Sequence, residues 1–196
     1  MQYAGFKICL SPAFCIFKKV FTVIIKVLKN IKNSNSIIGS MVKIIGFGNK
    51  YLSDDGIGPV IIEMLEKSDL SKNKNIELSD LGTSGTDLIF QIKECPRIVI
   101  IDALDAGQAP GKVIRIKEKD IEHFCNEGIL SLSLHDLNLA DILKLARAMK
   151  LKTDITIIGI KPLNIEFGEG LSPEIQGKIP EIITLVEQTI KQYKTT

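Results

Sequence analysis

Acidic residues and a histidine stand at the ends of the expected secondary-structure elements, where the residues of a site are often placed. Asp54 and Asp55 follow a short apolar run, Asp102 closes the most strand-like run of the chain, and His135 precedes an expected helix. Two carboxylates and one imidazole make a plausible incomplete shell for a borderline divalent ion such as Zn²⁺ or Ni²⁺, with positions left open for substrate. The sequence therefore predicts a metal-binding site, but the spacing does not choose between Asp54 and Asp55.

Each of these residues also has an ordinary structural explanation. Aspartate before a helix is a common N-cap, and the helix dipole favours its charge, so one of the two adjacent aspartates could serve only that purpose. A single histidine at a helix start, such as His135, often bonds to backbone, whereas Asp102 would be costly if it were buried without a partner. Asp105 is either a further ligand or a solvated loop acid, and His123 is expected at the surface.

Other kinds of site are excluded by the spacing of nearby residues. Gly46 and Gly48 are separated as in a dinucleotide-binding loop, but Tyr51 stands where the third glycine of that fingerprint should be. A second glycine-rich loop holds Thr83 and Ser84 without a G-x-S-x-G nucleophile elbow, so a tight turn is the better interpretation. The four cysteines form no C-x-x-C pair, which argues against a zinc knuckle or a disulfide framework and fits a reducing cytoplasm.

The elements that must position these residues alternate between strand-like and helix-like segments. This alternation predicts an α/β fold with a mainly parallel sheet, in which residues just past the carboxyl ends of strands face the ligand-binding crevice. The expected strands are 42–45, 76–81, 97–102, 112–116 and 154–160, and the expected helices are 56–67, 86–94, 136–150 and an interrupted helical region from Ser172 onward. The first helix should bury one face made of Ile57, Val60, Ile61, Met64 and Leu65.

Length and composition indicate one folded domain with an added N-terminus. The chain has 196 residues and a formal net charge of +2, which favours neither nucleic acid nor an anionic membrane as an obligatory partner. Residues 1–40 include a mostly apolar stretch that three lysines interrupt, so it is a poor transmembrane span and a poor signal peptide. We expect the working domain at 41–196, preceded by an extension that could be an amphipathic helix, an appendage or the product of an upstream start codon.

Several motifs in order resemble the hydrogenase maturation endopeptidases, the proteases that trim the large subunit of nickel–iron hydrogenases. The resemblance runs from Met41 to about Tyr193 and leaves residues 1–40 outside it. It rests on the motifs IIGFGNKYLSDDGIGP, GTSG, IVIIDALDAG, SLHDLNLADIL and IGIKP followed by GLSPEI.

The resemblance implies a fold and a set of site residues. The fold is a three-layer α/β/α arrangement whose twisted, five-stranded sheet carries helices on both faces. Matched motif by motif, the metal-binding constellation falls on Asp55, Asp102 and His135, and Asp55 is the first candidate for a catalytic role. Loops expected to line the substrate cleft contribute Gly48, Asn49, Asp54, Gly82, Thr83 and Gly85.

The resemblance also implies an activity. We expect an aspartic-type endopeptidase that removes a C-terminal peptide from the nickel-loaded precursor of a nickel–iron hydrogenase large subunit. The nickel would be that of the substrate, without an organic cofactor, and the protein would act as a cytoplasmic monomer. One alternative is a metal-sensing chaperone that binds the precursor and cuts nothing, because no separate nucleophile–base pair is visible. A weaker one is a phosphorylase-like α/β enzyme acting on a small molecule.

Overall fold

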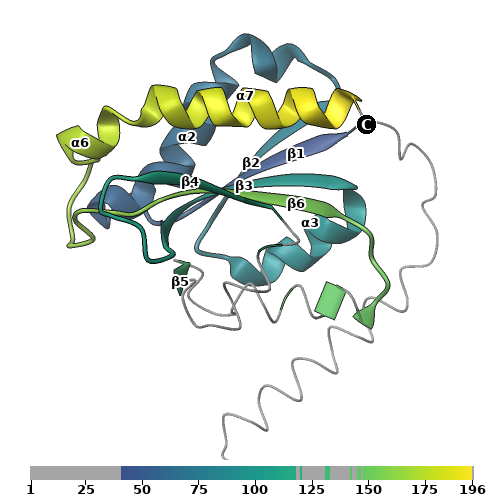
Figure 1. The fold of residues 1–196 in the computed structure, drawn as a ribbon, viewed down its shortest axis with the longest axis horizontal. Coiled ribbons are helices and arrows are strands. Elements are labelled where there is room, and N and C mark those ends of the chain that lie inside the picture. Colours follow the sequence, from purple (N-terminus) through teal and green to yellow (C-terminus); the bar gives the residue numbers. More distant parts are fainter. Residues whose placement is uncertain are drawn as a thin grey trace, which may run out of the picture. The chain divides into compact units, whose positions relative to one another are not determined.

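Helices cover both faces of one sheet in the part of the chain that the structure describes (Figure 1). The computed structural model describes residues 41–117, 120, 131–132, 142, 145–146 and 148–195. The strands are β1 (Val42–Phe47), β2 (Ile76–Gly82), β3 (Arg97–Asp105), β4 (Val113–Lys117), β5 (Ser131–Leu132) and β6 (Asp154–Ile160). The helices are α2 (Ile57–Glu66), α3 (Leu88–Glu94), α6 (Pro173–Gln176) and α7 (Ile179–Thr195). The expected N-terminal extension, residues 1–40, lies outside the described residues.

The main sheet has five strands in the order β2-β1-β3-β6-β4, and the two-residue β5 pairs with β3 beside it. β1 runs parallel to β2 and β3, and β3 runs parallel to β6, whereas β4 is antiparallel to β6 and β5 is antiparallel to β3. The prediction of a mainly parallel α/β sheet is therefore confirmed. Because β1 and β3 are parallel neighbours, with Gly46 opposite Ile101, their carboxyl ends lie at the same edge of the sheet.

Side chains of β1 and β3 alternate between two apolar cores, as the pleat of a strand requires. Val42 and Ile44 of β1 belong to the core shared with α2 and α7, and Ile45 belongs to the core shared with α3. Figure 1 shows α2 and α7 on one face of the sheet and α3 on the other. In β3, Ile100 and Leu104 belong to the α3 core, so the alternation places Asp102 on that same face.

Helix α2 buries a slightly different face from the predicted one. Ile57, Ile61 and Leu65 are buried as expected, but Met64 is 42% exposed and Ile62 is buried in its place. The segment is apolar over a wide arc, and packing against β1 and α7 selects Ile62 because it faces the sheet. No helix in the described part of the chain combines the length and the apolar character that crossing a bilayer requires.

The first turn of α2 lies directly against the ends of β1 and β3. A Cβ atom at Gly58 would lie 2.1 Å from the carbonyl oxygen of Phe47 and 2.6 Å from that of Ile101. Only glycine permits this approach of a helix to two strand backbones. The close contact holds the segment just before α2, which carries both adjacent aspartates, at the carboxyl edge of the sheet.

Candidate active site

Asp55 is held at the end of β1 by the loop that follows this strand. It lies in a short 3-10 helix, Ser53–Gly56, and is 6% exposed. The backbone N–H of Asn49 donates to Asp55 Oδ2 at 2.8 Å. The loop turns back on itself at Gly48, which has a φ of 128° and lies so close to Asp55 that a Cβ there would be 1.8 Å from its carbonyl oxygen. The carboxylate is thus fixed by backbone that folds tightly around it.

Asp102 occupies the neighbouring strand at the same edge. It is fully buried in β3, one residue past the Ile101–Gly46 pair and opposite Gly159 of β6. The 3-10 helix that carries Asp55 contacts β3. Two of the three predicted metal-binding residues, one in the 3-10 helix after β1 and one in β3, therefore lie at the carboxyl edge of the parallel strands, the part of an α/β sheet where ligands bind.

The third predicted ligand, His135, lies outside the described residues, as does His123. Among the residues that the structure describes, no three His, Cys, Asp or Glu side chains gather as a metal-binding group. The set of Asp55, Asp102 and His135 therefore stays a prediction. Of the expected helix 136–150, the described residues Ile142, Leu145 and Ala146 are helical, and Ile142 and Ala146 are buried in the α3 core.

Asp54 is an internal anchor and does not line a cleft, contrary to the prediction. Its side chain is 0% exposed. Asp54 Oδ2 accepts hydrogen bonds from the N–H groups of Leu163 and Asn164, both at 2.9 Å, and from the Ser172 hydroxyl at 3.0 Å. Asp54 Oδ1 accepts from the N–H of Ser172 at 2.7 Å. Four donors from one distant loop hold this carboxylate, so Asp54 has a structural role in joining residues 163–172 to the segment before α2.

The capping explanation of the sequence is wrong for the two adjacent aspartates. Neither Asp54 nor Asp55 caps α2, because the N-cap residue is Gly56 and no side chain bonds to the first turn. Ser172 is the N-cap residue of α6 and Pro173 follows it at the first helical position, although the Ser172 side chain makes no cap hydrogen bond. Its hydroxyl donates to Asp54 instead. A buried carboxylate without hydrogen bonds costs more free energy than an uncapped helix end that water can reach.

The other predicted cleft residues belong to two loops that are joined to each other. The N–H of Gly48 donates to the carbonyl oxygen of Gly82 at 2.9 Å, so the loops after β1 and β2 form one rim. Asn49 is half-buried and Thr83 is exposed on this rim, whereas Gly85 is buried at the start of a 3-10 turn before α3.

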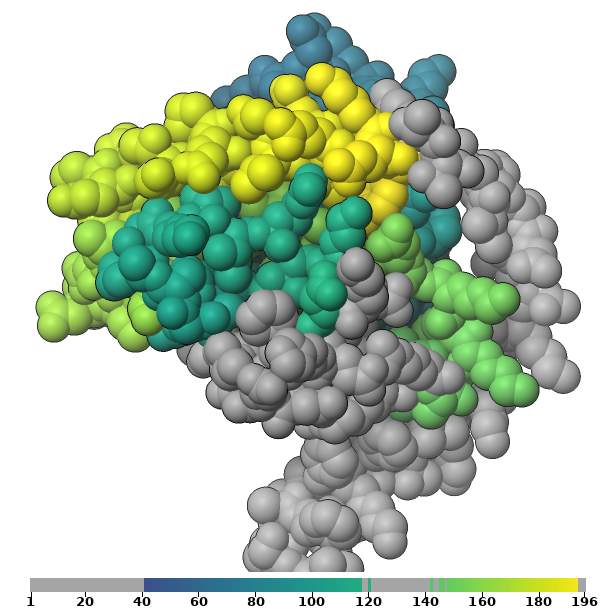
Figure 2. All heavy atoms as spheres, viewed as in Figure 1, coloured from purple at the N-terminus to yellow at the C-terminus, as the bar shows by residue number. Residues whose placement is uncertain are grey.

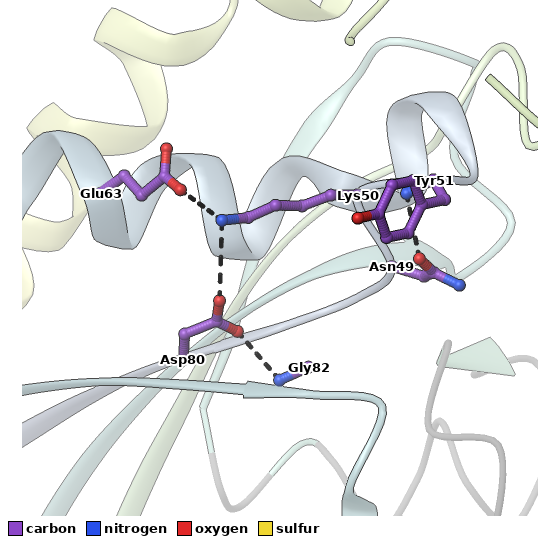
Figure 3. Close-up of polar contacts among 6 residues, drawn as sticks. All are labelled: Asn49, Lys50, Tyr51, Glu63, Asp80 and Gly82. Carbon is purple, nitrogen blue, oxygen red and sulfur yellow. Dashed lines mark hydrogen bonds and ion pairs between the residues drawn. The ribbon is translucent and has the colours of Figure 1, made fainter. Parts of the chain in front are cut away.

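Sequence reasoning missed a set of charged residues that braces this rim (Figure 3). The ammonium group of Lys50 hydrogen-bonds to Glu63 of α2, and it lies 3.9 Å from Asp80 Oδ2 at the end of β2. The other oxygen of Asp80 accepts from the N–H of Gly82 at 2.9 Å. The hydrogen bond raises the pKa of Lys50 and lowers the pKa of Glu63, so both groups stay charged near neutral pH. No spacing rule links residues 50, 63 and 80, so only the fold reveals them.

Asp105, the possible further ligand, forms an ion pair. Its Oδ2 atom lies 2.9 Å from Lys161 Nζ, and its Oδ1 atom accepts from the N–H of Gly107 at 2.9 Å. The hydrogen bond from Lys161 is the main reason that the pKa of Asp105 lies below its usual value. Asp105 is about half exposed, so this pair is a surface interaction at the end of β3.

Comparisons with known proteins agree with this architecture. The family model described as hydrogenase maturation protease (HycI) matches residues 59–189. The hydrogenase expression/formation protein HupD of Thiocapsa roseopersicina is 28% identical over 152 residues, covering 76% of this chain and 67% of that protein.

Solved structures give the same result. The hydrogenase maturating endopeptidase HybD from E. coli superposes with a TM-score of 0.67 at 25% identity, covering 78% of this chain and 93% of that one. The NiFe hydrogenase maturation protease HybD from Thermococcus kodakarensis gives a TM-score of 0.61 at 27% identity, covering 76% and 97% of the two chains. Since the family model spans well over half of the sequence and the sheet and its helices agree with it, the chain belongs to the hydrogenase maturation proteases.

Proposed function

We propose that the protein removes a C-terminal peptide from the nickel-loaded precursor of a nickel–iron hydrogenase large subunit. The observation that carries this proposal is that Asp55, in the 3-10 helix after β1, and Asp102, in β3 just past its last pair with β1, lie at the same edge of the sheet in a chain that belongs to the maturation proteases. The expected setting is the cytoplasm, where the protein would act as a monomer without an organic cofactor of its own.

The donor set suits a borderline divalent ion that belongs to the substrate. Two carboxylates and an imidazole, from Asp55, Asp102 and His135, are ligands that Ni²⁺ accepts, and a precursor that already holds nickel by its thiolates would complete the shell. Docking there would position the C-terminal extension along the joined rim of the loops after β1 and β2. The metal supplies a recognition point and can polarise the scissile carbonyl.

Asp55 is the residue proposed to act on the attacking water, which makes the protein an aspartic-type peptidase. Its Oδ2 atom is oriented by the Asn49 N–H at 2.8 Å, in the short 3-10 helix that follows the loop after β1. A carboxylate oriented at a strand end can accept the proton of the water as it attacks, a step that contributes about 10²- to 10⁴-fold in rate.

The alternative of a chaperone that binds the precursor without cutting it uses the same ligands. Purified components separate the two functions: the protein is mixed with nickel-loaded large-subunit precursor, and the C-terminal mass of the precursor is read by mass spectrometry. A protease shortens the precursor at catalytic amounts. A stoichiometric complex whose precursor keeps its full mass would support the chaperone and overturn the proposed activity.

A further inference from the structure

Four large apolar side chains are exposed together close to the candidate active site. Leu163, Ile165 and Phe167, in the loop between β6 and α6, are 47%, 61% and 86% exposed, and Tyr51, in the loop after β1, is 56% exposed. We call these four residues the loop patch. Burying a side chain of this size contributes about 1.5–3 kcal/mol, so keeping four of them in water is costly unless a partner covers them.

The backbone that carries the loop patch is fixed by hydrogen bonds between the two loops. The N–H of Gly168 donates to the carbonyl oxygen of Tyr51 at 2.9 Å, and the N–H of Ser53 donates to that of Gly168 at 2.9 Å. The Ser53 hydroxyl donates to the carbonyl oxygen of Glu166 at 3.0 Å. These bonds bring Tyr51 next to the apolar loop in space. A surface already ordered in this way loses little conformational entropy when it binds.

The same bonds tie the loop patch to the active site. Asp54 anchors this loop through Leu163, Asn164 and Ser172, and Asp55 is the next residue along the chain. On its other side the loop is joined to the connection between β3 and β4, because the N–H of Gly111 donates to the carbonyl oxygen of Lys161 at 2.8 Å. Figure 2 shows these two segments together at one edge of the described surface. The loop patch is therefore built on backbone that is bonded to Asp54, the residue next to Asp55.

A hollow beside the loop patch is large enough to receive a side chain of a protein partner. It has a volume of about 270 Å³ and is lined by Tyr51, Val60 and Leu171, with Lys50 and Glu169 also in its wall. That volume is below the roughly 300–1,000 Å³ of a typical small-molecule pocket, but it is enough for one side chain of a partner. Exposed apolar side chains beside a hollow of this size form a surface that a partner of complementary shape can bury, as at protein interfaces.

We propose that the loop patch is the docking surface for the hydrogenase large-subunit precursor, which covers it with an apolar surface of its own while its metal centre lies at Asp55. This inference rests on the proposed function. Phe167, the most exposed of the four, is the expected anchor, since buried aromatic residues contribute most to such interfaces. A second copy of this chain is the competing occupant.

The test is a kinetic comparison of the full-length protein with the double variant Ile165→Ser/Phe167→Ser on nickel-loaded precursor. We expect KM to rise about 10-fold or more with kcat within about 2-fold, because a docking contact is lost while the catalytic residues are unchanged. Met64→Ser, which removes another exposed apolar side chain from the outer face of α2, is the matched control and should leave KM unchanged. Thermal unfolding of all three proteins should agree, since these side chains are exposed.

The outcomes separate this inference from the proposed function. If the unmodified protein cleaves the precursor and the double variant does so with the same KM, the docking surface is wrong and the activity stands. If the unmodified protein cleaves no precursor, both proposals fail. Sedimentation measures the oligomeric state of both proteins. If the unmodified protein is a dimer and the double variant is a monomer, the loop patch binds a second copy of the chain and the inference is overturned.

Discussion

Replacing Asp55 by asparagine is expected to slow release of the C-terminal peptide at least about 100-fold while leaving the fold intact. The amide removes the charge that would bind the substrate's nickel and accept a proton from water, and general-base contributions are of this size. Asparagine keeps an oxygen that can accept the Asn49 N–H, which now donates to Asp55 Oδ2 at 2.8 Å. The measurement is the single-turnover rate on nickel-loaded precursor, with thermal unfolding recorded in parallel.

Asp80→Asn is the matched control for this variant. Asp80 lies at the end of the neighbouring strand β2, is about 38% exposed, and also accepts a backbone N–H, from Gly82. The same loss of charge at the same edge of the sheet should therefore change the rate by no more than a few-fold. An Asp55→Asn protein that processes precursor at the rate of the unmodified protein would remove Asp55 from the site.

Replacing Asp54 by alanine is expected to lower the free energy of unfolding by about 3–5 kcal/mol, because several buried donors lose their acceptor at once. The affected donors are the N–H groups of Leu163, Asn164 and Ser172 and the Ser172 hydroxyl. Urea unfolding measures the total loss. Hydrogen exchange should locate it, with the amides of the loop between β6 and α6 losing protection first.

Asp69→Ala gives the comparison for a surface acid. Asp69 is 94% exposed and contacts Lys72 across one turn, so its loss should change the free energy of unfolding by less than about 0.5 kcal/mol. An Asp54→Ala protein as stable as the Asp69→Ala protein, with the loop amides still protected, would show that the Asp54 carboxylate does not anchor residues 163–172.

The strands could be predicted from sequence because their signal is local. β3 and β6 each contain four consecutive β-branched residues, at 98–101 and 155–158, and both are interior strands of the sheet, buried on two faces. The predicted bounds differ from the observed ones by three residues at most, the largest difference being the extension of β3 to Asp105. The edge strand β4 was found for the same local reason, although its antiparallel direction depends on β6 entering the sheet between β3 and β4.

The different roles of Asp54 and Asp55 could not be predicted from spacing alone. The two residues are adjacent and chemically identical, and they differ in what reaches them from elsewhere in the chain. The partners of Asp54 lie more than 100 positions later, at 163–172, and no local pattern announces that contact. The resemblance to the maturation proteases favoured Asp55, and the structure shows that Asp54 is held by four hydrogen bonds from residues 163–172, which is a structural role.

The loop patch escaped prediction for a related reason. Leu163, Ile165 and Phe167 are apolar residues in a loop, and loop residues with such side chains are often folded inward. Their exposure follows from the backbone contacts with Tyr51, Ser53 and Asp54, which fix the path of the loop. The sequence pattern does not show the path of this loop or the exposure of its side chains, so the loop patch could be identified only from the structure.

The central claim is that this protease acts on a precursor whose nickel is already in place. The most direct measurement gives the unmodified protein the same large-subunit precursor in two forms, nickel-loaded and nickel-free, and follows the C-terminal mass of each with time. We expect the loaded form alone to lose its C-terminal peptide, because in the proposed function the nickel held by the precursor is the group that binds at Asp55, Asp102 and His135. Equal cleavage of the nickel-free form would contradict the claim. It would mean that Asp55 and Asp102 act without the metal of the substrate.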